Sequence, residues 1–365
     1  MPNRSGWPRV RPRAHPALFP FSILHSPFPP VALLADDAGH AQSGHPERPA
    51  RLAAVRDAIE ADDRLRDLDR VEGGAAPREA LERVHTPAFL DRVEALSGRG
   101  GGHFDPDTYV TAASWDVARR ACGGLLAVVD AVIEGGAAGF AIGRPPGHHA
   151  PPDRAMGFCL VNHVAVAARH AQAVHGADRV MIVDIDVHHG NGTQDTFYDD
   201  GSVLVVSSHQ AGIYPGTGAP DETGRGAGEG ATVNLPLPAG TDDALVDLYR
   251  AVLPPLAARF RPDLVLLSAG FDAHRLDPLA GLSLSVAGLV GLVGVVQEAA
   301  DAQDAPLALS LEGGYHAEAL AACVAGTLRR LHDPTAEVAD PFRPSRLPAP
   351  DLAALTDAVR RTHGL

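Results

Sequence analysis

Residues 183–192, VDIDVHHGNG, carry two aspartates and two histidines directly after an apolar run that is typical of a buried strand. In an extended segment alternate side chains share a face, so Asp184, Asp186 and His188 lie on one side. A carboxylate and an imidazole on one face suit a divalent, zinc-like metal, and Asp272 is the best candidate for a third ligand. One isolated aspartate would more simply cap a helix or form an ion pair, but the combination favours a metal site.

Two other segments contain groups that can transfer protons or donate hydrogen bonds. His148 and His149 follow Pro-Pro-Gly, and in a tight loop both imidazoles can reach a pocket, where a neutral imidazole can act as a general base. Tyr315 follows two glycines, and its phenol can donate a hydrogen bond to a developing oxyanion. Taken alone, the histidine pair is typical of a surface and the tyrosine of packing, so these roles depend on context.

The elements that would position these side chains alternate between strands and helices. The apolar runs predict strands at 31–36, 138–143, 179–186, 202–209, 263–270 and 306–314. Helical spacing predicts helices at 111–134, 162–174, 242–260 (interrupted by Pro-Pro), 285–301, 317–331 and 350–362. This alternation predicts right-handed βαβ units and an α/β fold, with a mainly parallel sheet covered by helices on both faces.

Polar, glycine-punctuated segments follow five of the predicted strands, starting at residues 144, 184, 207, 268 and 311. In parallel α/β sheets, ligands bind at the carboxyl ends of the strands. The sequence therefore predicts one site at this rim, to which all five segments contribute.

Composition limits the class of protein. The chain has 365 residues, 45% of them apolar, which is enough for a large α/β core. Its formal net charge of −14 argues against a general affinity for nucleic acid or anionic membranes. The three cysteines are far apart, which favours a reducing, cytoplasmic compartment, and no apolar run is long enough to span a bilayer. Residues 1–30, rich in proline and arginine, are predicted to be a disordered tail.

Other catalytic motifs do not fit. The sequence contains no GxSxG elbow, no HExxH motif and no P-loop. Cys159, between Phe158 and Leu160, is predicted to be a buried wall residue rather than a nucleophile. The glycine-rich segment 216–230 is predicted to be a flexible loop.

Several motifs together resemble the zinc-dependent histone deacetylase family, which includes bacterial histone deacetylase-like amidohydrolases and acetylpolyamine amidohydrolases. They are GHPERPARL, RPPGHHA, DRAMGFC, VDIDVHHGNGTQDTFY, YPGTG, SAGFDAHRLDPLAG and LEGGYH, and HGNGTQ resembles the class II type. The resemblance covers about 31–330 and implies an arginase-deacetylase fold with a central eight-stranded parallel sheet. We expect a deacetylase domain at 31–345 and a C-terminal helix within 346–365.

The same resemblance implies roles for single residues. It implies three zinc ligands, namely Asp186, His188 and Asp272. His149 would act as general base and acid, oriented by Asn191, where some branches carry aspartate. His148 would be held by Asp184, and Tyr315 would bind the substrate carbonyl. The implied reaction is zinc-assisted hydrolysis of an amide to acetate and a free amine.

Further residues are assigned to the pocket and to a second ion. The substrate pocket would be formed by Gly157, Phe158, Tyr214, Leu279 and Asp105. A structural potassium ion would be surrounded, partly by backbone oxygens, by Asp184, Asp186, His188, Ser207 and Ser208. Leu279 stands where a polyamine-selective branch carries glutamate, which favours an acyl-lysine substrate. His189 is predicted to be structural.

Three alternatives remain open at this point. The chain could deacetylate polyamines or other small acylated amines, or bind acyl-lysine without catalysis. A more distant alternative is an arginase-like ureohydrolase with two manganese ions. The expected partner is an acyl-lysine peptide or protein, or a small acylated amine, rather than nucleic acid or a membrane. The oligomeric state is left open.

Overall fold

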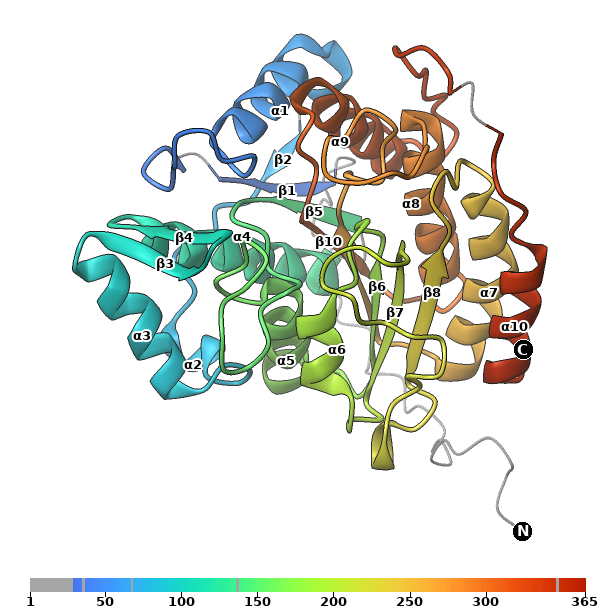
Figure 1. Cartoon of the computed structure of the whole chain (residues 1–365), viewed down its shortest axis with the longest axis horizontal. Coiled ribbons are helices and arrows are strands. Elements are labelled where there is room, and N and C mark those ends of the chain that lie inside the picture. The colour runs from blue at the N-terminus through green and yellow to red at the C-terminus, as the bar shows by residue number, and fades with distance from the viewer. Residues whose placement is uncertain (1–28, 35–36, 67, 136–137, 346–347) are drawn as a thin grey trace, which may run out of the picture.

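The computed structural model describes residues 29–34, 37–66, 68–135, 138–345 and 348–365 (Figure 1). The tail predicted at 1–30 therefore falls almost entirely outside the described residues, and Pro30 begins the first strand. Within the described ranges, no helix combines the length and the apolar character needed to cross a bilayer.

A central sheet of eight parallel strands has the order β2-β1-β5-β10-β9-β6-β7-β8. Its strands are β1 Pro30–Leu33, β2 Asp69–Arg70, β5 Ala138–Ile142, β6 Val180–Asp184, β7 Val203–Gln210, β8 Thr232–Leu237, β9 Leu264–Ala269 and β10 Leu307–Leu311. A separate antiparallel hairpin consists of β3 Gly101–Asp105 and β4 Thr108–Thr111. The eight-stranded parallel sheet confirms the predicted α/β fold class.

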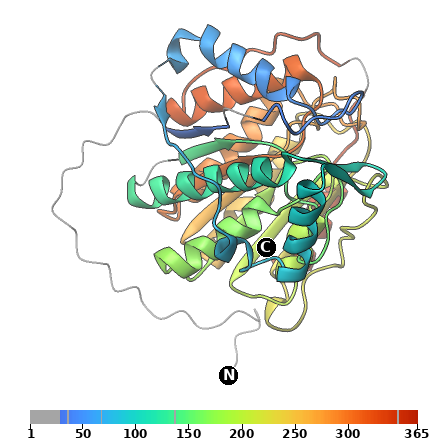
Figure 2. The same ribbon diagram turned by 90° about the vertical axis from the view of Figure 1, so that its left-hand side faces the viewer.

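Ten α-helices are present in the described part of the chain. They are α1 Ala50–Ala61, α2 Arg78–Leu81, α3 Pro87–Gly98, α4 Ser114–Gly135, α5 His163–His175, α6 Asn191–Phe197, α7 Leu245–Phe260, α8 Val286–Asp301, α9 Ala317–His332 and α10 Ala353–His363. Figure 2 shows the blue helix α1 and the orange-red helix α9 stacked on one side of the sheet, across from the green helices.

Strand side chains alternate between two apolar cores, one on each face of the sheet. In β6, Met181 and Val183 belong to one core, and Val180 and Ile182 belong to the other. The first core also contains side chains of α1, α7, α8 and α9, whereas the second contains side chains of α3, α4 and α5. Because both faces are covered, both sets of alternate positions must be apolar, which explains the uninterrupted apolar strands.

The predicted Pro-Pro interruption does not occur, because α7 runs unbroken through Pro254 and Pro255. Proline inside a helix removes a backbone hydrogen bond and costs about 3 kcal/mol. The neighbouring Leu253 and Leu256 are fully buried in the first core. Their packing offsets this cost, which a propensity argument cannot include.

The two edge strands of the sheet, β2 and β8, were not predicted from the sequence. Strand β8 follows the glycine-rich segment 216–230 and contains Pro236, which weakens a strand pattern. It is the last strand in the sheet order, and an edge strand tolerates proline. At the other edge, β2 has only two residues, too few for a periodic signal.

The C-terminal helix packs on the domain. Helix α10 contacts α7 and β8, and Leu352 and Val359 are buried in the first core (Figure 1). Arg259 of α7 also donates a hydrogen bond to the carbonyl oxygen of His363. The described part of the predicted C-terminal segment, residues 348–365, is therefore attached to the domain through both α7 and β8.

Candidate active site and metal centre

The predicted site residues meet at the carboxyl ends of neighbouring strands. Strand β6 ends at Asp184, so Asp186 and His188 lie just beyond it, and Asp272 lies just beyond the adjacent strand β9. Strands β10 and β5, next along the sheet, are followed by Tyr315 and by the two histidines at 148 and 149. These side chains lie close together because the strand order β5-β10-β9-β6 brings segments that are distant in the sequence to one edge of the sheet.

Asp186, His188 and Asp272 form a compact group of metal-ligand side chains. One ligand atom of each lies within 4.8 Å of the others. Nδ1 of His188 is 3.1 Å from Oδ1 of Asp186 and 3.3 Å from Oδ2 of Asp272. The remaining oxygens accept backbone hydrogen bonds, because Val187 donates to Oδ1 of Asp272 and Gly313 donates to Oδ2 of Asp186.

Two further observations fit a bound cation in this group. Oδ2 of Asp272 is buried and accepts no hydrogen bond within the described structure, as expected of an atom that faces an ion. A Cβ at Gly313 would lie 2.0 Å from that oxygen, and a Cβ at Gly270 would lie 2.1 Å from Oδ2 of Asp186. Glycine at both positions leaves the carboxylates their space. Two carboxylates and an imidazole, with positions left for water or substrate, match the donor set of a catalytic zinc site.

The electrostatics of the group also favour a cation. Burial and the neighbouring carboxylate of Asp186 raise the pKa of Asp272 to about 7. Burial alone would lower the pKa of His188, but its contacts with Asp186 and Asp272 raise it to about 10. The ion-free group therefore retains protons near neutral pH, and a divalent cation would displace them.

The tandem histidines have opposite electrostatic environments. His148 donates from Nδ1 to Oδ2 of Asp184 at 3.0 Å. Although burial opposes it, the charges of Asp186 and Asp184 raise the pKa of His148 to about 10. Burial and the positive charges of His148 and His188 instead lower the pKa of His149 well below its usual value. At neutral pH His149 is thus the neutral member of the pair.

Asn191 fixes the orientation of His149. Nδ1 of His149 lies 2.8 Å from Oδ1 of Asn191, which can only accept, so Nδ1 carries the proton and Nε2 is free. Asn191 begins helix α6, and its amide nitrogen donates to the sulfur of Met156. This second contact agrees with the amide orientation that presents oxygen to the histidine.

A cavity of about 210 Å³ opens above these groups. It is lined by His149, Gly157, Phe158, His188, Tyr214, Leu279, Tyr315 and Asp107. The ring of Phe158 packs edge-on against Tyr315, with centroids 5.7 Å apart, and Tyr214 packs edge-on against His149 at 5.1 Å. Burial raises the pKa of Tyr315 well above its usual value, so its phenol keeps its proton and remains a donor.

The turn at Gly157 shapes one wall of the cavity. Gly157 has a φ of +57°, and a Cβ there would lie 2.5 Å from Cδ2 of His149 and 2.9 Å from Cε1 of Tyr214. Phe158 follows with a φ of +69°, which is costly for an aromatic residue and typical of a functional turn. Its backbone N–H donates to Oγ1 of Thr108 in the hairpin, which holds the turn in place.

The acidic residue on the cavity wall is Asp107 rather than Asp105. Asp105 ends β3 and Asp107 lies in the turn before β4, and Oδ1 of Asp105 accepts a hydrogen bond from the backbone N–H of Asp107. Asp105 thus stabilises the turn that presents Asp107. The hairpin was not predicted from the sequence, and so the facing residue could not be chosen.

Other residues that hold the site were not identified from the sequence. Asp277 accepts backbone hydrogen bonds from Tyr315 at 2.6 Å and from Leu279 at 3.0 Å, and so positions two lining residues. Arg51 donates to the carbonyl oxygens of Glu312 and Gly314, which flank the glycine turn before Tyr315. These residues could have been identified from the motifs DPLAG, LEGGYH and GHPERPARL, in which they occur.

Glu312 and Cys159 form a buried layer beneath the histidine pair. Oε2 of Glu312 accepts hydrogen bonds from the backbone N–H groups of Gly147 and His148, and burial raises its pKa to about 7. Burial also raises the pKa of the Cys159 thiol well above its usual value, so this thiol is unreactive.

The residues assigned to potassium lie together, but the ion stays a prediction. Asp184 and Ser207 are paired in register between β6 and β7. The hydroxyl of Tyr249 donates to Oγ of Ser208 at 2.7 Å and lies 3.4 Å from the carbonyl oxygen of Asp184. His189 contacts Thr217 and Gln194 through its two ring nitrogens.

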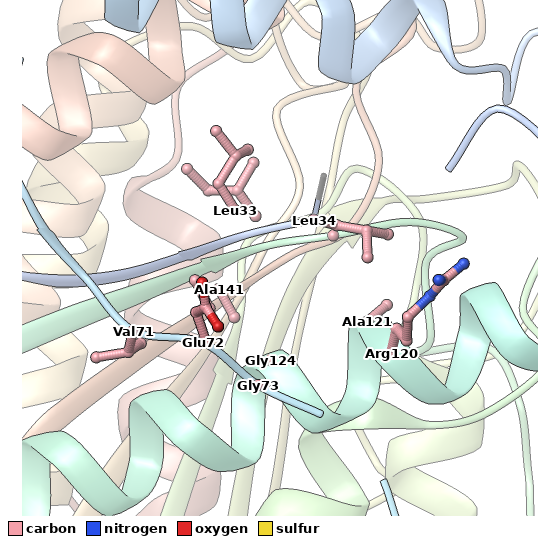
Figure 3. A pocket seen from close by; sticks show the side chains of 12 residues that line it. Leu33, Leu34, Val71, Glu72, Gly73, Arg120, Ala121, Gly124 and Ala141 are labelled. Atoms are coloured by element: carbon pink, nitrogen blue, oxygen red, sulfur yellow. The ribbon is translucent and has the colours of Figure 1, made fainter. Parts of the chain in front are cut away.

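A second cavity, of about 270 Å³, lies beside β1 and β5, toward the β2 edge of the sheet. It is bounded by Leu33 at the end of β1, by Leu34 after it, by Ala141 of β5, and by Arg120 of α4 (Figure 3). Glu72 contributes the one carboxylate among its described lining residues, and these include no histidine or cysteine. Its lining therefore lacks the ligand types gathered at the first cavity.

Comparisons with known proteins identify the family and agree with the fold. A histone deacetylase domain model matches residues 45–331. Histone deacetylase 14, chloroplastic, of Arabidopsis thaliana is 38% identical over 351 residues, which cover 90% of this chain and 82% of that protein. A histone deacetylase-like amidohydrolase of Pseudomonas aeruginosa is 38% identical over 319 residues, which cover 86% of this chain and 81% of that protein. The crystal structure of the HDA15 HD domain superposes with a TM-score of 0.80 at 35% identity, covering 91% of this chain and 95% of that one. The chain therefore belongs to the histone deacetylase family, and its sheet has the arginase-deacetylase fold.

Proposed function

We propose that this chain is a zinc-dependent hydrolase that removes acetyl or a similar acyl group from lysine side chains. The observation that carries the proposal is the group of Asp186, His188 and Asp272 at the base of a cavity that also contains His149 and Tyr315. The names of the relatives, which include deacetylases and an amidohydrolase, support hydrolysis of an amide.

The proposed mechanism assigns one task to each side chain. Zinc held by Asp186, His188 and Asp272 would polarise the amide carbonyl and lower the pKa of a bound water. His149 takes the proton of the attacking water at Nε2 and later gives it to the leaving amine. Tyr315 donates its phenolic proton in a hydrogen bond to the developing oxyanion. The products are acetate, or another carboxylate, and the free amine.

The pairing of His149 with Asn191 affects the first proton transfer. The low pKa of His149 keeps it neutral and able to accept a proton at neutral pH. A neutral amide stabilises the resulting imidazolium less than a carboxylate would. We therefore expect His149 to be a comparatively weak base and, once protonated, a strong acid toward the leaving amine.

The walls of the cavity favour an uncharged chain. Phe158 and Tyr214 provide aromatic surface and Leu279 provides aliphatic surface, all suited to the methylene groups of an acyl-lysine. Asp107 in the same lining is the one observation that favours a small cationic acylamine as a second candidate substrate. Its carboxylate is exposed, so water screens its attraction for an ammonium group.

A substrate panel tests the proposal. Purified chain supplied with zinc is assayed with acetyl-lysine peptides, acetylputrescine and acetylspermidine, and we expect the highest kcat/KM with the peptides. Two matched variants complete the panel. Leu279→Glu should raise kcat/KM for the acetylpolyamines relative to the peptides, and Leu279→Met should leave this ratio unchanged. A higher kcat/KM of the wild-type chain for the polyamines would overturn the choice of substrate.

Two outcomes would overturn the reaction itself. Turnover of none of these substrates by zinc-loaded protein would favour a non-catalytic acyl-lysine binder. Two manganese ions bound at the active site would favour a ureohydrolase.

A further inference from the structure

A second group of metal-ligand side chains lies between helices α4 and α5. It consists of Asp130 from α4 and of His170 and His175 from α5, and one ligand atom of each lies within 4.8 Å of the others. Nε2 of His170 and Nε2 of His175 are each 2.7 Å from the same atom, Oδ1 of Asp130. Both imidazoles therefore converge on one carboxylate oxygen.

This cluster is far from the catalytic cavity. The N-cap of α5, Asn162, contacts the carbonyl oxygen of Ala150 beside the tandem histidines, whereas His175 is the last residue of the helix. A helix of 13 residues is about 20 Å long, so the two sites lie near opposite ends of α5. Figures 1 and 2 show α4 and α5 adjacent on one face of the sheet.

The tertiary packing, rather than the local sequence, creates the cluster. Residues five apart on a helix point about 140° away from each other, so His170 and His175 are not simple neighbours on α5. They meet because the carboxylate of Asp130 on α4 lies between their rings, whose centroids are 5.6 Å apart. The ligands thus come from two packed helices, which hold the three side chains in place.

The distances are close to those of a zinc site. Zinc binds imidazole nitrogen and carboxylate oxygen at about 2.0–2.2 Å, which places ligand atoms of a tetrahedral site about 3.3 Å apart. The nitrogen–oxygen contacts of 2.7 Å would need to open by about half an ångström. A bound metal ion would take the place of the two imidazole N–H protons that point at Oδ1 of Asp130.

Exposure leaves room for further ligands. The side chains of His170 and His175 are 12% and 17% exposed, so packing restrains both rings. The side chain of Asp130 is 44% exposed, which leaves one side of the cluster open to water. Two imidazoles and one carboxylate with an open side suit zinc, cobalt, nickel or copper better than magnesium or calcium, which prefer oxygen ligands alone.

We propose that Asp130, His170 and His175 form a second binding site for a divalent transition-metal ion, separate from the active site. An ion bound there links α4 to α5, two helices that contact each other and cover the same face of the sheet. The expected consequence is greater stability of this face rather than a change in the reaction rate.

Zinc stoichiometry tests the proposal. Tag-free, full-length chain is dialysed against buffered zinc, and zinc per chain is measured by atomic emission. We expect two equivalents for the wild-type chain and one for the double variant His170→Gln/His175→Gln and for Asp130→Asn. The control His103→Gln removes an exposed histidine outside the cluster and should keep two equivalents.

A second readout separates this site from the active site. Thermal unfolding should show a higher Tm at two zinc equivalents than at one for the wild-type chain, and no such rise for the double variant. Deacetylase activity with excess zinc should be equal in both, and the single variants replace the double variant if circular dichroism shows that it is unfolded. Equal zinc content in the wild-type chain and in both cluster variants would overturn the proposal. A single wild-type equivalent that is lost in the cluster variants would instead contradict the zinc proposed at the active site. The difference between wild type and variants therefore does not depend on the proposed catalytic function.

Discussion

At the level of single residues, the two adjacent histidines differ because their ring nitrogens face different partners. His148 faces the carboxylate of Asp184 at 3.0 Å, and His149 faces the amide of Asn191 at 2.8 Å. The first is held charged and the second is held neutral. A neutral imidazole beside an aromatic cavity is what proton transfer at neutral pH requires. Two predictions follow from these contacts.

His149→Ala and Tyr315→Phe should each lower kcat by about 10²- to 10⁴-fold, because one removes the proton acceptor and the other the oxyanion donor. Steady-state kinetics on an acetyl-lysine peptide measures the effect. Circular dichroism and zinc content should remain those of the wild-type chain. A rate within a factor of about three of wild type would refute the assigned role of that residue.

Asn191→Asp should move the acidic limb of the kcat/KM pH profile to higher pH. Burial and the charge of His148 keep the pKa of His149 low, and a carboxylate at 191 opposes them. A base is active when unprotonated, so a raised pKa means that activity is lost at a higher pH on acidification. The check is a pH series for both chains. An unshifted limb would mean that another group controls it.

At the level of elements, the segment before α1 fastens the site to the sheet. Glu47 accepts hydrogen bonds from Arg144, which follows β5, and from Arg51, the residue that also binds the turn after β10. All three side chains are buried. Although burial opposes it, His40 and Arg144 lower the pKa of Glu47 well below its usual range. The motif GHPERPARL is thus explained by an ion-pair network that joins the ends of two strands.

Glu47→Gln should destabilise the chain by about 3–5 kcal/mol at pH 7, because it removes the carboxylate that pairs with buried Arg51 and leaves buried Arg144 with the carboxylate of Asp37 alone in this network. The pKa of Glu47 is lowered on folding, so its contribution is complete above about pH 4.3 and is lost as the pH falls further. Urea denaturation at pH 7, 5, 4 and 3 should therefore show the difference between variant and wild type shrinking toward acid.

The matched control for this experiment is Glu60→Gln, an exposed glutamate on the helix that follows Glu47, α1. It should change the free energy of unfolding by less than about 0.5 kcal/mol at every pH. An equal effect of both variants would contradict the role assigned to the Glu47 network.

At the level of the whole molecule, the proposed metal centre links two strands and a loop from distant parts of the chain. Asp186 and His188 follow β6, Asp272 follows β9, and the turn after β10 donates to Asp186 through Gly313. Without an ion, two buried carboxylates face each other across His188. A cation at this point would stabilise the arrangement in addition to the catalytic role proposed for it.

Chelation of zinc should abolish activity and lower Tm by a few degrees, and added zinc should restore both. A ligand at 100 times its Kd stabilises the folded state by about 2.7 kcal/mol. The measurement is made in the His170→Gln/His175→Gln background, so that the second proposed site does not contribute. Full activity after complete removal of zinc would exclude the metal-dependent reaction.

The sequence by itself determined the sheet class and the residues at several strand ends. Strand and helix periodicity are local properties, and alternate residues of an extended segment share a face, so Asp184, Asp186 and His188 could be grouped without coordinates. The motifs also indicated the family, because their order along the chain is itself sequence information.

Only the tertiary structure decided which distant groups meet. The order β9-β6 brings Asp272 to His188, the turn of the hairpin presents Asp107 instead of Asp105, and the packing of α4 on α5 places Asp130 between two histidines. Contacts of this kind depend on the pairing and packing of segments far apart in the chain. Local periodicity specifies the face on which a side chain lies, but it does not specify what lies opposite.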